Sequence, residues 1–276
     1  MRIALCNEVL GDIPLERQCE YAAGLGYDGL EIAPFTLSES PERISSTEAA
    51  RIRKVVEASG LVVTGLHWLL VKPVGLSLTD PDATLRKRTI DVMIRLSTLC
   101  AELGGAVLVH GSPAQRQIAA GESHATALAR VRDGLAQVAS AAAEAGVVYC
   151  IEPLARQQTL VINTFAEAAD LVRSIDQPSL RTMIDCSAAG LAETETIAEL
   201  IDRWLPTGLI AHIHVNDPNR RGPGQGAMKF APIVAALKRH HYAGTIAVEP
   251  FDYFPDGSSV AAFAAGYLRG LGEAEG

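Results

Sequence analysis

The sequence lacks the features that mark secreted or membrane-spanning proteins. Its five cysteines form no Cys-x-x-Cys pair and lie in apolar segments, so we expect reduced, buried thiols. No stretch approaches the ~20 uninterrupted apolar residues that a membrane span needs. The chain opens directly on a strand pattern, without an apolar leader. We therefore predict a cytoplasmic protein that does not insert into membranes.

Aromatic residues and positive charge are also scarce. Aromatics make up 5% of the 276 residues, and 24 Lys and Arg against 32 Asp and Glu give a formal net charge of −8. A nucleic acid partner would require basic side chains to neutralise its phosphates, so the composition argues against one. Hydrophobic residues, by contrast, reach 48%, which is enough for a large aliphatic core.

Short apolar runs alternate with longer amphipathic ones along the whole chain. The predicted strands are Arg2–Asn7, Asp28–Ala33, Leu61–His67, Ala106–His110, Val147–Glu152, Arg181–Asp185, Leu209–Asn216 and Gly244–Glu249. The predicted helices are Pro14–Gly24, Ser46–Ser59, Asp80–Leu103, Glu122–Ala145, Thr164–Ile175, Thr194–Arg203, Ala231–Arg239 and Gly257–Leu271. This pattern predicts an α/β fold, a (β/α)₈ TIM barrel that spans 1–276 as a single domain. A doubly wound open sheet is the main alternative, but Gly11 alone does not supply its glycine-rich phosphate loop.

Each predicted strand ends on or beside a polar side chain. These polar ends are Glu8, Glu31, His67, His110, Glu152, Asp185, His214 and Glu249. The C-terminal ends of barrel strands converge on the active-site face. A capped loop would explain any single one of them, but a whole ring indicates a polar site.

Four successive strands close on side chains that could share one metal ion: Glu152, Asp185, His214 and Glu249. Three carboxylates and one imidazole aimed at a common point would be unfavourable unless a cation neutralised them. The donor set suits a divalent ion, with Mn²⁺ the first expectation and Mg²⁺, Co²⁺ or Zn²⁺ as alternatives. A slip in strand register would instead leave only two of the four as ligands.

Four segments resemble the xylose-isomerase-like barrel superfamily, and within it most closely the ketose 3-epimerases of the tagatose and psicose epimerase group. They are Ile151–Arg156, Met183–Asp185, His212–Arg220 with Pro223–Gly226, and Ala247–Phe251. Each motif alone is weak, but the four in this order are specific. The order of strands and helices agrees along the whole chain.

The resemblance implies that the four residues bind a single divalent metal, and that Glu152 and Glu249 also form an acid/base pair. One glutamate would remove the proton beside the carbonyl of a small polyhydroxylated substrate, giving a cis-enediolate, and the other would return a proton from the opposite face. It also implies that Arg220 binds substrate oxygens, that Phe251 forms an apolar wall, and that the protein is a homodimer or homotetramer.

Two positions depart from those epimerases. Gln158 stands where they carry a glutamate, and Ala188 where they carry a histidine that contacts the reacting end of the sugar. Another keto-polyol therefore remains an alternative substrate, and a lyase that dehydrates an inosose remains an alternative reaction on the same site. A nuclease of the same superfamily would require more histidines and a basic groove, and a non-catalytic sugar-binding protein would not require both Glu152 and Glu249.

Several further residues have two interpretations. His67, Trp68 and His110 are predicted to bind substrate together with Gln158, although satisfied barrel histidines would look the same. Glu8 and Glu31 are expected to line the pocket rather than bind metal. His212 is expected one layer below His214, as core or support. The loop of Arg220 and Arg221 with its glycines could hold a phosphate or be an ordinary solvated loop.

Overall fold

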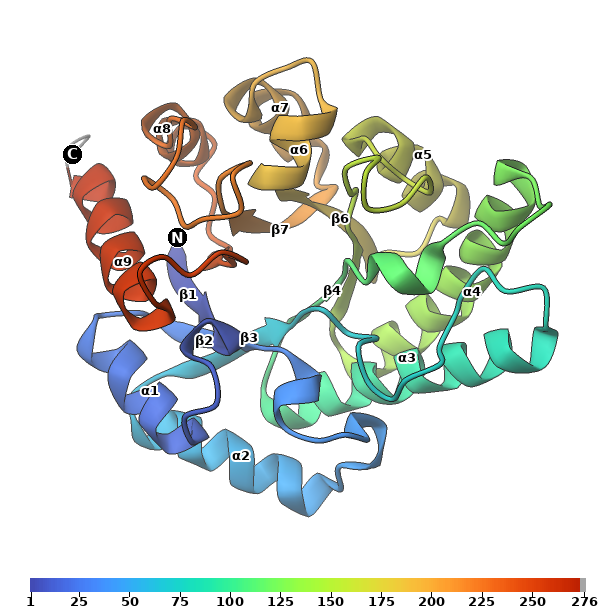
Figure 1. Cartoon of the computed structure of the whole chain (residues 1–276), viewed down its shortest axis with the longest axis horizontal. Coiled ribbons are helices and arrows are strands. Elements are labelled where there is room, and N and C mark those ends of the chain that lie inside the picture. The colour runs from blue at the N-terminus through green and yellow to red at the C-terminus, as the bar shows by residue number, and fades with distance from the viewer. Residues whose placement is uncertain (274–276) are drawn as a thin grey trace.

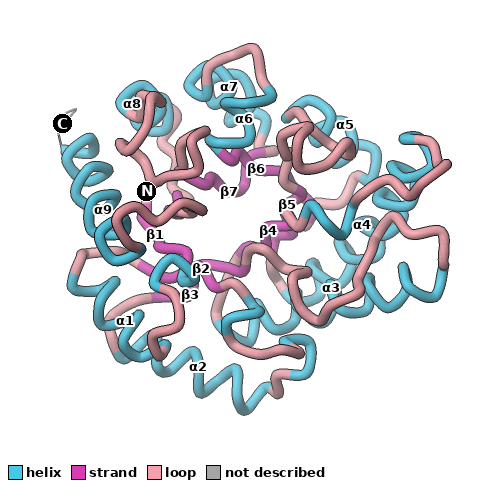
Figure 2. The backbone as a smooth tube through the Cα atoms, viewed as in Figure 1, coloured by secondary structure: helices cyan, strands magenta, loops and turns pink. Residues whose placement is uncertain are grey.

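The computed structural model of the protein describes residues 1–273 and is built on a closed barrel of parallel strands enclosed by helices (Figure 1). The strands are β1 (Arg2–Cys6), β2 (Gly29–Ile32), β3 (Val62–Leu66), β4 (Val107–His110), β5 (Val148–Ile151), β6 (Leu180–Asp185), β7 (Ile210–Val215) and β8 (Thr245–Val248). They pair in chain order, and β8 closes the ring against β1. Figure 2 shows the strands as an inner ring with the helices outside it. The predicted (β/α)₈ barrel is confirmed, and the open sheet is excluded.

The helices follow the strands in alternation. They are α1 (Leu15–Gly24), α2 (Ser46–Ala58), α3 (Ala83–Leu103), α4 (His124–Ala145), α5 (Phe165–Ile175), α6 (Cys186–Ala192), α7 (Ile197–Trp204), α8 (Ala231–Arg239) and α9 (Gly257–Glu273). Every predicted helix is present, and the short α6 is an addition. The predicted domain extends to residue 276, so its last three residues lie outside the described part of the chain.

The helix that was predicted from Thr194 begins later, at Ile197, because Thr196 caps it. The Thr196 side chain accepts a hydrogen bond from the backbone N–H of Glu199, and the Glu199 side chain binds back to the Thr196 backbone. This reciprocal capping box satisfies two N–H groups that would otherwise lack partners at the helix start.

The barrel interior is divided into an apolar floor and a polar rim. Val107, Val109, Cys150 and Met183 pack together inside the strands as a cluster separate from the main core. The main core lies between the strands and the helices and includes outward-facing residues such as Tyr149. Because side chains alternate along a strand, the inward-facing residues that follow the floor are the polar ones at the strand ends.

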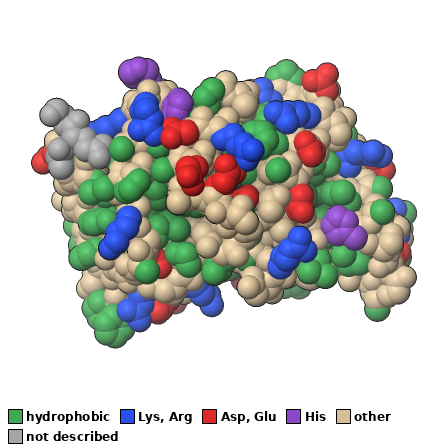
Figure 3. Space-filling model, turned by 90° about the horizontal axis from the view of Figure 1, so that it is seen from above, with side chains coloured by type: hydrophobic (Ala, Val, Ile, Leu, Met, Phe, Trp, Pro, Cys, Tyr) green, Lys and Arg blue, Asp and Glu red, His purple; other side chains and the backbone are tan. Residues whose placement is uncertain are grey.

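The rest of the chain agrees with the composition. The five cysteines, Cys6, Cys19, Cys100, Cys150 and Cys186, are all free and buried. Across residues 1–273, no helix combines the length and the apolar character that crossing a membrane requires. On the face drawn in Figure 3, Lys and Arg are scattered among Asp, Glu and hydrophobic side chains and form no continuous basic groove.

Candidate metal centre and active site

The four predicted metal ligands come together at the C-terminal mouth of the barrel. Glu152 follows β5, Asp185 ends β6, His214 lies near the end of β7, and Glu249 follows β8. One donor atom from each lies within 4.8 Å of the others, and all four side chains are buried. The predicted strand register is therefore correct at each of these positions.

His214 is held by a carboxylate beneath it. Its Nε2 lies 2.8 Å from Oε1 of Glu31, a hydrogen-bonded contact, and its Nδ1 faces the cluster, 2.8 Å from Oε2 of Glu249. When Nε2 donates to Glu31, the lone pair of Nδ1 points at the cluster. Glu31 was expected to line the pocket, but it is fully buried and contacts His214 instead. His212 lies below as expected, with Nε2 2.7 Å from Oε2 of Glu31.

Opposite charges in this buried group shift its protonation equilibria strongly. Burial alone would raise the pKa of Glu31, but His212 and His214 outweigh it and hold that pKa well below its usual value. Burial would lower the pKa of His214, but the carboxylates of Glu249 and Glu31 outweigh that effect and raise it well above its usual value. The mouth of the barrel is thus a region of strongly negative potential.

Asp185 is fixed by two hydrogen bonds. Its Oδ1 accepts from the backbone N–H of Ala188 at 2.6 Å, which caps α6, and its Oδ2 accepts from the Asn216 side chain at 2.7 Å. Asn216 also donates to the backbone carbonyl of Glu249 at 3.0 Å. Burial and the nearby Glu249 raise the pKa of Asp185 to about 6. Asn216 was not predicted as a site residue, although it lies two residues after His214 and so shares its strand face.

The carboxylate of Glu152 packs against the backbone of Gly111, where a residue with a side chain would collide with it. A Cβ on Gly111 would lie 2.2 Å from Oε2 of Glu152. The fully buried guanidinium of Arg116 donates to the backbone carbonyl of Glu152 at 2.6 Å. Burial, together with Asp185 and Glu249, nevertheless raises the pKa of Glu152 well above its usual value. Arg116 ends a short 3-10 helix, Pro113–Arg116, so the alternation of side chains along strands does not predict where it points.

The donor set fits a divalent cation. Three buried carboxylates converge on one imidazole nitrogen, and mutual repulsion of this kind is relieved by a metal ion. Nδ1 of His214 lies 2.8 Å from Oε2 of Glu249 without hydrogen-bond geometry, and it has no hydrogen-bond partner within residues 1–273. A ring nitrogen aimed into a carboxylate cluster in this way is positioned to exchange a proton for a metal ion. These four residues could therefore hold one ion.

A cavity of about 470 Å³ opens above the cluster. Among the predicted substrate-binding residues, Trp68, Gln158, Arg220 and Phe251 line it. The two histidines predicted with them are not in its lining within residues 1–273. His67 is fully buried beneath the cavity, 2.9 Å from Glu8, and Nδ1 of His110 lies 2.9 Å from the hydroxyl of Tyr149.

The loop after β7 places Arg220 beside Phe251. The backbone carbonyl of Arg220 accepts from the N–H of Phe251 at 2.7 Å, and its guanidinium lies 5.8 Å from the centre of the Phe251 ring. Asp217 organises the loop by accepting hydrogen bonds from the N–H groups of Asn219 and Met228. A Cβ at Gly226 would lie 2.1 Å from the Asp217 carboxylate, so this glycine permits close packing inside the loop.

Comparison with known proteins identifies the family. The sequence pattern of the "Xylose isomerase-like TIM barrel" family matches residues 19–269. The chain is 29% identical to D-psicose 3-epimerase of Agrobacterium fabrum over 245 residues, which cover 84% of this chain and 78% of that protein.

Two solved structures share the fold. The D-psicose 3-epimerase from Clostridium cellulolyticum H10, determined with D-tagatose, has a TM-score of 0.83 at 21% identity, covering 98% of this chain and 99% of that one. A 3-keto-D-glucoside 4-epimerase from E. coli also has a TM-score of 0.83, at 22% identity and the same coverage. Because the family pattern spans most of the chain, the protein belongs to the xylose isomerase-like TIM barrel family.

Proposed function

We propose that the protein is a divalent-metal-dependent sugar epimerase that acts on a small ketose or keto-polyol. The observation that carries the proposal is the convergence of Glu152, Asp185, His214 and Glu249 below a cavity of about 470 Å³. The relatives named above, a 3-epimerase and a 4-epimerase of sugars, support the same class of reaction. A cavity of this size suits a single small ligand.

In this proposal the four converging residues hold the ion, with Mn²⁺ the first expectation. When bound, the ion polarises the substrate carbonyl and so acidifies the adjacent C–H. Glu152 and Glu249 follow different strands, β5 and β8, so a carbon bound between them has a carboxylate on each side. One carboxylate removes the proton to leave a cis-enediolate, and the other returns a proton to the opposite face, which inverts the centre.

The cavity lining then determines how the sugar lies. Arg220 donates to substrate oxygens, and Gln158 adds a polar group at the same rim. Trp68 and Phe251 pack edge to face with ring centres 5.5 Å apart, which gives the sugar an apolar wall. The lyase alternative receives no support from the relatives named above, which are epimerases. Assembly as a homodimer or homotetramer and a cytoplasmic location stay predictions.

Solvent exchange tests the proposal directly. A panel of ketoses, inososes and keto acids is incubated with the Mn²⁺-loaded protein in D₂O. We expect deuterium at the carbon beside the carbonyl of at least one compound, and a diastereomer as the product. Glu152→Gln and Glu249→Gln should each slow this exchange by about 10²- to 10⁴-fold, the usual contribution of a general acid or base.

Glu144→Gln is the matched control, because Glu144 is an exposed glutamate near the end of α4, before the start of β5, whereas the cluster lies at the strand ends. It should exchange at the wild-type rate. Full exchange in both active-site variants would refute the assigned acid/base pair, and an unsaturated product in place of a diastereomer would turn the assignment to a lyase.

A further inference from the structure

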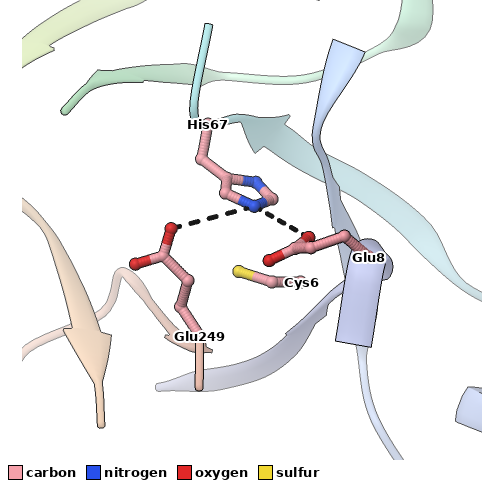
Figure 4. Close-up of side chains that lie close together, drawn as sticks. All are labelled: Cys6, Glu8, His67 and Glu249. Carbon is pink, nitrogen blue, oxygen red and sulfur yellow. Dashed lines mark hydrogen bonds and ion pairs between the residues drawn. The ribbon is translucent and has the colours of Figure 1, made fainter. Parts of the chain in front are cut away.

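A second cluster of donor atoms lies beside the first, on the side of the barrel where the chain begins. Its members are Cys6 at the end of β1, Glu8 just after it, His67 just after β3, and Glu249 after β8. One donor atom from each lies within 4.8 Å of the others, and all four residues are buried. Figure 4 shows the thiol, the imidazole and the two carboxylates pointing toward one another.

Hydrogen bonding inside the cluster leaves polar atoms without partners. Nε2 of His67 and Oε2 of Glu8 are hydrogen-bond partners, 2.9 Å apart. The other oxygen of Glu8, Oε1, has no hydrogen-bond partner within residues 1–273, although the side chain is only 7% exposed. In Figure 4 this free oxygen lies on the side of the Cys6 sulfur. An unpaired buried carboxylate oxygen costs about 1–3 kcal/mol or more, so the site is incomplete without another group.

Carboxylates stand beside the thiol. Cys6 is fully buried and belongs to the hydrophobic core, but donor atoms of Glu8 and Glu249 also lie within 4.8 Å of it. A cation bound to the sulfur would displace the thiol proton to solvent, because a coordinating thiol is deprotonated.

The spacing of the donors suits tetrahedral coordination. Ligand bonds of about 2.0–2.3 Å at tetrahedral angles place neighbouring donors about 3.4 Å apart. Nε2 of His67 lies 2.9 Å from Oε2 of Glu8 and 3.8 Å from Oε1 of Glu249, on either side of that spacing. These two distances each lie within about half an ångström of that spacing, and the remaining donor pairs lie within 4.8 Å of one another.

We propose that Cys6, Glu8, His67 and Oε1 of Glu249 form a second metal site, selective for a thiophilic divalent ion such as Zn²⁺. Thiolate and imidazole donors favour such ions, whereas the carboxylate-rich first cluster suits harder ones. Glu249 belongs to both clusters. Its Oε2 lies 2.8 Å from Nδ1 of His214, and its Oε1 lies 3.8 Å from Nε2 of His67. The two oxygens of this carboxylate could therefore serve one ion each.

One consequence concerns catalysis and rests on the proposed function. Glu249 needs a free oxygen to exchange a proton with substrate. Zn²⁺ at the second site engages Oε1 while the first ion engages Oε2. Zn²⁺ binding therefore lowers the epimerase activity of the Mn²⁺-loaded protein.

Metal counting tests the site without reference to activity. Protein dialysed against Zn²⁺ or Co²⁺ is analysed for metal content, and the Co²⁺ form for a near-ultraviolet sulfur-to-cobalt charge-transfer band. Wild type should hold two ions per chain and show the band. Cys6→Ser should hold one ion and lose the charge-transfer band. Asp185→Ala should also hold one ion but should retain the band. Cys100→Ser is the matched control, because the Cys100 thiol is buried and donates a hydrogen bond to the backbone carbonyl of Val107. This variant should retain both ions and the band.

The two variants separate this proposal from the proposed function. A wild-type protein without the band, or a Cys6→Ser protein that retains two ions, would overturn the second site. An Asp185→Ala protein that retains both ions would overturn the first site and leave the second standing. If Cys6→Ser does not fold, Glu8→Gln supplies the same loss of one ion. Added Zn²⁺ should lower exchange by the Mn²⁺-loaded wild type at least tenfold and leave that of Cys6→Ser unchanged; equal inhibition of both would refute the link to Glu249.

Discussion

Replacing Glu31 with glutamine removes one negative charge beneath His214 and keeps the size of the side chain. In the native protein, Oε1 of Glu31 pairs with Nε2 of His214 at 2.8 Å, and Oε2 lies 2.7 Å from His212. The carboxylate fixes the tautomer that presents Nδ1 to the cluster, and it makes the imidazole more basic. Loss of such a partner typically weakens metal binding 10- to 100-fold, which is about 1.4–2.8 kcal/mol. We expect a fall in Mn²⁺ affinity of that size in Glu31→Gln.

Competition with a chelator of known Mn²⁺ affinity measures the dissociation constant for wild type and variant. Unfolding of the metal-free proteins is followed in parallel, so that a loss of fold is not mistaken for a loss of affinity. Glu57→Gln, an exposed change on α2, is the control and should bind Mn²⁺ as wild type does. If Glu31→Gln folds normally and its dissociation constant stays within twofold of wild type, Glu31 does not position His214.

Two further outcomes follow from the same cluster. Gly111→Ala places a Cβ 2.2 Å from Oε2 of Glu152, so the carboxylate must move by about an ångström. We expect the rate of proton exchange to fall about 10²-fold, while the free energy of unfolding of the metal-free protein changes little. An undiminished exchange rate would show that the position of this oxygen does not matter for exchange. The metal-free protein should lose stability as the pH rises from 5 to 7, because the raised pKa values of Asp185 (about 6, against 3.8), Glu152 and His214 mean that the folded state binds more protons than the unfolded state in that range. Asp185 alone contributes about 1 kcal/mol to the loss between pH 5 and 7, which urea denaturation at the two pH values measures. A metal-free protein whose stability rises with pH in this range would contradict the assigned shifts.

The fold could be predicted because barrel strands and helices leave strong periodic signals. Apolar runs bounded by helix caps located all eight strands, and their polar ends marked the mouth of the barrel where the candidate site lies. The short helix α6 was missed because it follows Asp185 with no connecting loop. A strand that passes directly into a helix shows no turn residues between them, so the boundary is not visible in composition.

The failures at individual residues come from contacts that depend on the closed ring. Glu31 and His214 are 183 positions apart, and only the three-dimensional barrel brings β2 and β7 close enough for a bond across its mouth. His110 was grouped with the inward-facing strand ends, but Val109 before it faces the barrel interior, so His110 faces Tyr149 on the outer side. A strand has a side-chain period of two, and a slip of one residue reverses the direction of a side chain.

Closure of the barrel also explains why the polar strand ends form two clusters that lie side by side. Strands β5 to β8 supply the carboxylate-rich cluster, whereas β1 and β3 lead to the thiol, the imidazole and Glu8. Because β8 pairs with β1, Glu249 at the end of the last strand stands beside Cys6 near the start of the chain. A substitution of Glu249 must therefore disturb both clusters, and only variants of unshared residues, such as Asp185 and Cys6, can assign an observed metal ion to one of them.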